Sequence, residues 1–144
     1  DAATLKYTVN DGVVVGLVFL SDHVTDISPV RALTGLQSLD CSGSWDPINS
    51  IKSGLSQLTD LSPLRGLVLT SLECNGTEVA DLSPLEGMAL ERLSLAMTPV
   101  SDLSAIDAQH LTYLNLNITQ VTDARLAHFN DCQKLRTLRL GLRR

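Results

Sequence analysis

The sequence is poor in aromatic residues, which make up 3% of its 144 residues although 44% of them are hydrophobic. Its core is therefore expected to be aliphatic. No apolar run approaches the roughly 18 residues needed to span a bilayer, and no basic start precedes a hydrophobic stretch with a cleavage site. We expect neither a membrane segment nor a signal peptide within this sequence, and a location that is cytoplasmic or undetermined.

Cysteine is also scarce. The three cysteines, Cys41, Cys74 and Cys132, are an odd number, and no two of them lie close together in the sequence. This argues against a disulfide framework and mildly favours a reducing compartment.

Excess positive charge is absent as well. The formal net charge is −5, which argues weakly against nucleic acid as a partner. All acidic residues lie between Asp1 and Asp131, whereas five of the eleven Lys and Arg residues occupy the last eleven positions. This basic end is interpreted either as a solvated edge or as a surface that meets an acidic neighbour.

What the sequence does contain is an internal repeat. Residues 58–67 (LTDLSPLRGL), 79–88 (VADLSPLEGM) and 100–109 (VSDLSAIDAQ) are variants of one motif. Its aspartate recurs after a gap of 34 residues and then at steps of 21, at Asp26, Asp60, Asp81, Asp102 and Asp123. A second motif, L-x-x-L-x-L/C, keeps the same phase at residues 36–41, 69–74, 90–95, 111–116 and 135–140, with a looser copy at 14–19.

These motifs are the pattern of a leucine-rich repeat. The L-x-L alternation predicts a short strand with one buried face. One coil cannot bury its own apolar side, so successive coils stack into a solenoid. We predict an α/β solenoid of about six repeats over residues 14–141, with a parallel β-sheet on the concave side and short 3-10 or α turns on the convex side.

The D-L-S-P-L motif is interpreted as the convex turn. Proline suits the first helical position and the preceding serine is a preferred N-cap, so Ser28-Pro29, Ser62-Pro63 and Ser83-Pro84 are predicted to start one-turn helices. The aspartate is predicted to accept a hydrogen bond from the backbone two residues on. Where the chain leaves each strand, a threonine hydroxyl is expected to satisfy a backbone group, at Thr77, Thr98 and Thr119.

The aligned carboxylates raise the alternative of a calcium site. Calcium takes six to eight oxygen ligands, usually several from one short loop. Each turn here offers one carboxylate and no companion acid. We therefore predict no metal site and no cofactor.

The regions outside the regular repeat carry their own predictions. Asn10-Asp11-Gly12 between β-branched runs predicts a hairpin within residues 1–15 that caps the sheet. Residues 42–57 are predicted to be a loop insertion, in which Trp45 either plugs the coil or is an exposed anchor. Residues 121–135 are predicted to include an α-helix of about two turns, with Leu126, Phe129 and Cys132 on its apolar face. We assign residues 1–144 to a single domain and expect more repeats, or a second chain, beyond the uncapped last strand.

The chain resembles bacterial leucine-rich repeat proteins across about residues 14–141. Its repeat is similar to that of internalins, which is usually one residue longer and has Asn where this sequence has Thr. It is most similar to repeat arrays attached to bacterial serine/threonine protein kinases, through VTDISPVRALTGLQSLDCSG and VTDARLAHFNDCQKL. The resemblance implies protein–protein interaction or sensing in signal transduction. No kinase motif occurs in this sequence, so a kinase domain would lie outside it.

Solenoids bind partners through the outward positions of their strands, and those positions here are mostly small and polar. The residues most typical of binding hot spots are Arg92, Tyr113 and Arg139. The predicted contact residues, on the concave face and the insertion, are Asp40, Trp45, Glu73, Arg92, Tyr113, Asn115 and Arg139. The expected function is a protein-binding module of a larger signalling protein; the alternatives are a structural spacer in a longer array and a secreted, internalin-type adhesion module.

An enzyme is not expected. His23, His110 and His128 fall in different phases of different coils, without a nucleophile or carboxylate at motif spacing. Cys41 and Cys74 occupy leucine positions of adjacent coils and are predicted to be inert core thiols. We therefore predict no catalytic residues.

Overall fold

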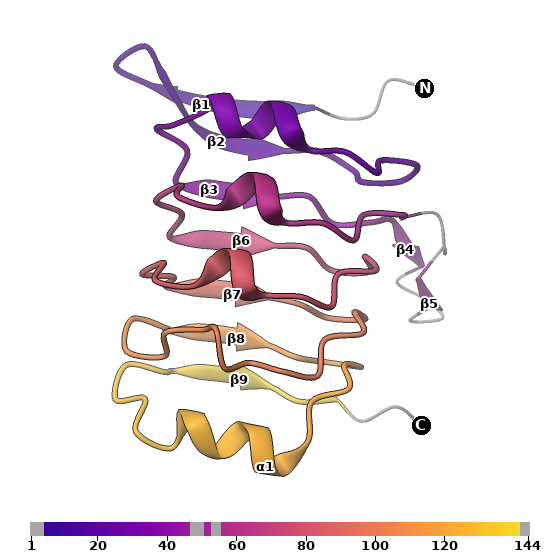
Figure 1. Ribbon diagram of the computed structural model, residues 1–144, viewed down its shortest axis with the longest axis vertical. Coiled ribbons are helices and arrows are strands. Elements are labelled where there is room, and N and C mark those ends of the chain that lie inside the picture. The colour runs from indigo at the N-terminus through magenta and orange to yellow at the C-terminus, as the bar shows by residue number, and fades with distance from the viewer. Residues whose placement is uncertain (1–4, 47–50, 53–55, 142–144) are drawn as a thin grey trace.

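The parallel strands of this chain stack into one ladder. The structure is a computed structural model that describes residues 5–46, 51–52 and 56–141. Its seven-stranded sheet has the order β1-β2-β3-β6-β7-β8-β9. The bounds of these strands are β1 Lys6–Asn10, β2 Val13–Val18, β3 Ser38–Asp40, β6 Ser71–Glu73, β7 Arg92–Ser94, β8 Tyr113–Asn115 and β9 Thr137–Arg139. Short helices lie in front of the sheet in Figure 1, so the connecting segments form a second layer. This is the predicted leucine-rich repeat solenoid.

The register of the sheet follows the predicted phase of the repeat. From β2 to β9 every pairing is parallel, and equivalent positions of successive coils face one another. The middle leucine of each of the four inner strands points into the core: Leu39, Leu72, Leu93 and Leu114 are at most 1% exposed. Burying one leucine contributes about 1.5–3 kcal/mol, so each stacked coil adds to the stability of its neighbours.

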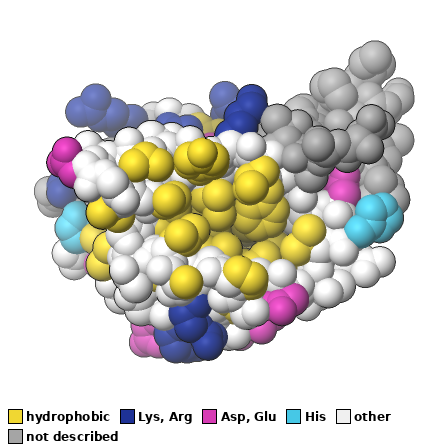
Figure 2. All heavy atoms as spheres, turned by 90° about the horizontal axis from the view of Figure 1, so that it is seen from above, with side chains coloured by type: hydrophobic (Ala, Val, Ile, Leu, Met, Phe, Trp, Pro, Cys, Tyr) yellow, Lys and Arg dark blue, Asp and Glu magenta, His cyan; other side chains and the backbone are white. Residues whose placement is uncertain are grey.

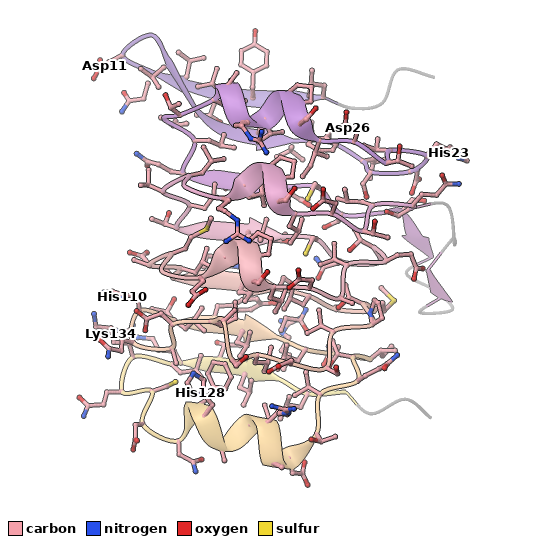
Figure 3. The ribbon with its side chains drawn as sticks, in the orientation of Figure 1. Asp11, His23, Asp26, His110, His128 and Lys134 are labelled. Atoms are coloured by element: carbon pink, nitrogen blue, oxygen red, sulfur yellow. The ribbon has the colours of Figure 1, made fainter. Side chains whose placement is uncertain are left out.

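The convex turns are braced by aspartate. Asp81 accepts a hydrogen bond from the backbone N–H of Ser83 at 2.8 Å on Oδ1, and another from the Ser83 hydroxyl at 3.0 Å on Oδ2. Asp26 and Asp60 make the same two bonds, and Figure 3 labels Asp26 beside the first of these turns. The predicted role of the aspartate is confirmed in these three turns.

The predicted role of the serine is wrong in one respect. Each serine is the first residue of a 3-10 helix, in η1 (Ser28–Ala32), η2 (Ser62–Leu64) and η3 (Ser83–Leu85). The N-cap positions are Ile27, Leu61 and Leu82, and none makes a side-chain capping bond. Because the aspartate accepts hydrogen bonds from both the backbone N–H and the hydroxyl of the serine, the hydroxyl does not cap the helix.

The threonines satisfy the backbone as predicted. The buried hydroxyl of Thr77 donates to the Cys74 carbonyl at 2.8 Å, and that of Thr98 donates to the Leu95 carbonyl at 2.7 Å. Thr119 repeats the bond to Leu116 at 2.9 Å. Each bond joins residues three apart, so it closes the turn that leads the chain out of its strand.

The sheet begins with the predicted hairpin. Strands β1 and β2 pair antiparallel, and Asp11 and Gly12 at the turn have φ of 48° and 79°. The hairpin nevertheless leaves an apolar surface at this end of the solenoid, because Leu5, Tyr7 and Val9 are 50–67% exposed. Figure 2 views this end and shows hydrophobic side chains gathered across it.

The last coil is more helical than the others. Helix α1 (Asp123–Leu126) continues into the 3-10 helix η4 (Ala127–Phe129), so the predicted two-turn α-helix is α-helical only in its first part. Phe129 is 7% exposed, whereas Leu126 and Cys132 are half-buried. Among the described residues no helix has the length and apolarity to cross a membrane.

The insertion contains a small β-ribbon that was predicted to be a loop. Strands β4 (Trp45–Asp46) and β5 (Ile51–Lys52) pair antiparallel. Its base is fixed to the first coil, because the hydroxyls of Ser21 and Ser56 lie 2.8 Å apart in a buried hydrogen bond. The two alternatives for the Trp45 side chain lie outside what the structure describes.

Candidate functional site

The outward positions of the strands form continuous rows across the sheet. One row follows the register through Val18, Asp40, Glu73, Ser94, Asn115 and Arg139. The neighbouring row on the same face runs through Gly16, Ser38, Ser71, Arg92, Tyr113 and Thr137. Six of the seven predicted contact residues therefore lie in two adjacent rows of the concave face. Trp45 lies apart from them, in β4 of the insertion.

Tyr113 is the centre of a basic cluster on this face. The guanidinium carbon of Arg92 lies 4.4 Å from the centroid of the Tyr113 ring, and that of Arg139 lies 5.8 Å from it. Both cations are within reach of the negative face of an aromatic ring, which attracts a guanidinium within about 6 Å. Arg92 and Tyr113 are direct partners on β7 and β8. The stacking arises because the repeat places them at equivalent positions of consecutive coils.

Two carboxylates lie next to each other nearer the start of the ladder. Asp40 and Glu73 are direct partners on β3 and β6. Partial burial raises the pKa of the Glu73 carboxyl, and the neighbouring charge of Asp40 raises it further, while Arg92 opposes the shift. One oxygen of Asp40 accepts a hydrogen bond from the backbone of Ser42 at 3.0 Å. This part of the concave face is therefore acidic and partly desolvated.

Between the acidic and basic parts runs a chain of polar hydrogen bonds. The Ser94 hydroxyl donates to the side-chain Oδ1 of Asn75 at 2.7 Å, and the side-chain amide of Asn115 donates to the Ser94 hydroxyl at 3.1 Å. Ser94 and Asn115 are only 3% and 9% exposed. The side chain of Asn115, one of the predicted contact residues, is thus engaged in holding neighbouring strands together.

A hollow of about 310 Å³ opens beside Arg139, and its lining was not singled out from the sequence. Met97 and Ile118 contribute its apolar part, and both have φ of 58°. Gly76 occupies the equivalent place one coil earlier, with φ of 68°. A β-branched residue such as isoleucine rarely adopts this left-handed conformation. The only sign of this hollow in the sequence is that Met97 and Ile118 stand where an earlier coil has Gly76.

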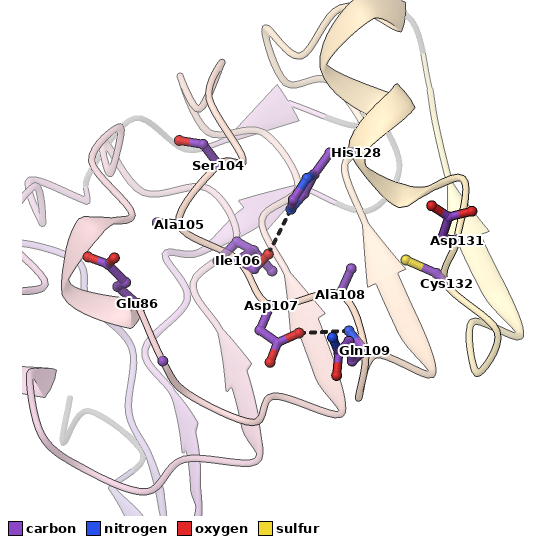
Figure 4. Close-up of a pocket in the computed structure, with 11 residues that line it drawn as sticks. Glu86, Ser104, Ala105, Ile106, Asp107, Ala108, Gln109, His128, Asp131 and Cys132 are labelled. Atoms are coloured by element: carbon purple, nitrogen blue, oxygen red, sulfur yellow. Dashed lines mark hydrogen bonds between the residues drawn. The ribbon is translucent and has the colours of Figure 1, made fainter.

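A second groove lies on the convex side, with a volume of about 470 Å³. It opens where Ala105 replaces the proline of the three preceding turns, and Ser104 begins no 3-10 helix there. His128 approaches the Ile106 carbonyl at 3.3 Å across this groove (Figure 4). Asp107 is engaged by the backbone of Gln109 at 2.9 Å. Within the described residues no group of three His, Cys, Asp or Glu side chains is placed to hold a metal ion.

The described histidines and cysteines do not meet in one centre. His23, His110 and His128 lie on three different connecting segments (Figure 3). Cys41 and Cys74 are free thiols with no exposed surface, and burial raises the pKa of both, that of Cys74 to about 12. A thiol with so high a pKa is neither a nucleophile nor a ready metal ligand near neutral pH.

Comparisons with known proteins find similarity in the fold. A scan against protein-family models finds no match, and a search of curated proteins finds no relative. Solved structures are similar, among them two from Listeria monocytogenes. An internalin (inlF) has a TM-score of 0.70 and 28% identity, and the match covers 83% of this chain and 32% of that one. Internalin C2 has a TM-score of 0.59 and 27% identity, and the match covers 90% of this chain and 62% of that one.

This chain thus spans less than two thirds of either internalin. The similarity agrees with the repeat spacing and with the parallel ladder described above. The chain is a leucine-rich repeat solenoid similar to bacterial internalins.

Proposed function

We propose that the chain is a protein-binding module and that its partner docks on the concave face of the sheet. The observation that carries this proposal is the Arg92–Tyr113–Arg139 cluster beside the hollow at Met97 and Ile118. Arginine and tyrosine are enriched among the residues that dominate binding energy. The core of the sheet does not need these outward side chains, since the leucines of the same strands fill it.

The finer assignment is to a signalling protein, and it is supported by the sequence resemblance to kinase-attached arrays. The similarity to internalins supports an adhesion module instead. Both assignments use the same surface, so one experiment on the concave face tests the binding proposal that they share.

A spacer function within a longer array is the competing proposal. Leu138 and Leu140 in and beside β9 are 42% and 50% exposed, as expected of a coil that another coil would cover. A spacer needs apolar ends but no binding residues on its concave face. Substitutions of Arg92, Tyr113 and Arg139 therefore separate the two proposals.

The test is affinity capture from a native lysate, with quantitative mass spectrometry, using wild type and the triple variant R92A/Y113A/R139A. The matched control is R31A/R65A, which removes two exposed arginines from the convex turns. We expect the triple variant to lose partners that wild type and the control both retain, with an unchanged circular dichroism spectrum. Recovery of the same partners by all three proteins would refute the concave-face proposal.

A further inference from the structure

The concave face changes the sign of its charge along the ladder. Asp40 and Glu73 supply the acidic part on β3 and β6, and Arg92 and Arg139 supply the basic part on β7 and β9. Lys6 borders the acidic part, where it lines a hollow together with Asp40. Within the described residues no ion pair joins these five side chains to one another. Their charges are therefore open to a partner.

The acidic part is suited to a cation. Glu73 is half-buried and lies beside Asp40, so two carboxylates share a site with reduced solvation. Bringing a positive group between them relieves their repulsion and replaces the lost water. A lysine or arginine side chain of a partner supplies such a group at the end of a long flexible stem.

The basic part is suited to a carboxylate. The guanidinium of Arg92 lies over the Tyr113 ring, with its carbon 4.4 Å from the ring centroid, and this contact restrains its planar fork of donors before any partner arrives. Arg139 flanks the same ring on the next strand. A guanidinium so positioned loses less conformational freedom when it binds a carboxylate in bidentate fashion.

The hollow beside Arg139 provides space for the rest of a bound segment. Met97 and Ile118 give it a small apolar wall, and Asn117 adds a side-chain amide with no partner among the described residues. An extended backbone presents both apolar side chains and peptide groups, so it matches this mixed lining. A folded, flat surface does not reach into it.

We infer that the concave face binds an extended peptide segment of a protein partner that carries a basic residue, for Asp40 and Glu73, and an acidic residue, for Arg92 and Arg139. This inference rests on the proposed function and specifies the chemistry of the partner.

The geometry also sets the spacing of the two charges. Adjacent strands lie about 4.8 Å apart, so β6, which carries Glu73, and β9, which carries Arg139, are separated by on the order of 14 Å. An extended peptide that runs along the ladder, across the strands, advances about 3.4 Å per residue. The acidic residue is therefore expected about four residues from the basic one, in either chain direction.

The experiment is an NMR titration of the isotope-labelled chain with synthetic peptides about nine residues long on an extended Ser/Thr background. The first peptide carries Lys and Glu about four residues apart, and the second has the same composition with the two charges adjacent. The third carries Lys alone and the fourth Glu alone. We expect the first peptide to bind more tightly than any other, by up to about fivefold, the upper end of what one exposed ion pair contributes.

Charge-swap variants give an independent readout. Glu73→Lys should abolish the preference for the first peptide, and the double variant Glu73→Lys with Arg139→Glu should restore part of it, because the peptide can bind in the opposite direction. The circular dichroism spectrum and melting temperature of each variant verify that it folds. Glu73→Gln, which removes the charge without reversing it, repeats the test if Glu73→Lys does not fold.

Equal affinity for all four peptides, or shifts confined to residues outside β3 to β9, would overturn the inference. If concave-face substitutions still abolish capture of a native partner, that result leaves the proposed function standing and refutes only the charge pattern. If the concave-face substitutions leave capture of native partners unchanged, the proposed function is refuted by the affinity-capture experiment. The two failures are therefore distinguishable.

Discussion

The guanidinium carbon of Arg92 lies 4.4 Å from the centroid of the Tyr113 ring, closer than that of Arg139, which lies 5.8 Å away. This difference reflects the sheet. Arg92 is the direct cross-strand partner of Tyr113, whereas Arg139 pairs with Asn115 and reaches the ring diagonally. Direct partners on one face have their side chains about 5 Å apart, so the contact with Arg92 should be the stronger.

We predict a measurable coupling between Arg92 and Tyr113. In a double-mutant cycle of R92A and Y113L, the coupling in the free energy of unfolding should be about 0.5–1 kcal/mol, the range for an exposed cation–π pair. Urea unfolding measures it. The R139A and Y113L cycle serves as the matched control and should give a smaller value. Equal couplings, or none for Arg92, would contradict the stacking geometry.

The contact between Arg92 and Tyr113 is an example of a feature that the repeat spacing predicts. A constant step of 21 residues places Arg92 and Tyr113 at equivalent positions, so their adjacency follows once the strands are known to be parallel and in register. The leucine rows, the aspartate turns and the threonine bonds were predictable for the same reason. Each coil must close in the same way to stack on its neighbour.

Features that depend on one coil alone were not predictable. The serine before each proline is a preferred N-cap by type, but the aspartate two residues earlier is already positioned to take both of its hydrogens. The hollow at Ile118 depends on a non-glycine residue adopting a positive φ, which residue preference argues against. The ribbon of β4 and β5 lies in the insertion, where no second copy of the pattern exists for comparison.

The convex turns predict how stability depends on pH. The pKa values of Asp26, Asp60 and Asp102 are lowered, first by a hydrogen bond from the backbone of the serine two residues on and next by its hydroxyl. A lowered pKa in the folded state means that the unfolded chain binds more protons in this range. The stabilisation is therefore complete above the unfolded value of about 3.9 and is lost as the pH falls through the folded values.

Urea unfolding midpoints measured over the acidic range test this prediction. The triple variant D26N/D60N/D102N should show a shallower loss of stability below about pH 4 than wild type. The control is S62A, which removes the hydroxyl but keeps the backbone donor to Asp60, so it should retain most of the pH dependence. An acid slope that the asparagine variant leaves unchanged would show that other groups cause it.

The threonine bonds predict a difference between two chemically identical substitutions. Thr77 has no exposed surface, and its hydroxyl donates to the Cys74 carbonyl at 2.8 Å. Thr77→Val keeps the shape but removes the donor, and a buried carbonyl without a partner costs about 1–3 kcal/mol. Thr119→Val removes the same bond at a half-buried position, where water can replace it. Thr77→Val should lower the free energy of unfolding more than Thr119→Val in urea titrations, and equal losses would contradict the assigned burial.

The cysteines predict an order of chemical reactivity. Thiol reagents attack the thiolate, so reaction requires both access and a pKa near the working pH. Burial raises the pKa of Cys74 to about 12, and it raises that of Cys41 well above its ordinary value. Cys132 is half-buried, and its pKa is raised by burial and by the charge of Asp131.

In the native protein at about pH 8, close to the ordinary pKa of a free thiol, only Cys132 should react with Ellman's reagent, and more slowly than free cysteine. All three cysteines should react in denaturant. The variant C132S should show no rapid native reaction, while C41S and C74S should react as wild type does. Because Cys41 and Cys74 fill leucine positions of adjacent coils, their labelling measures the opening of the core. Native labelling of either at the rate of Cys132 would contradict the closed stacking of the β3 and β6 coils.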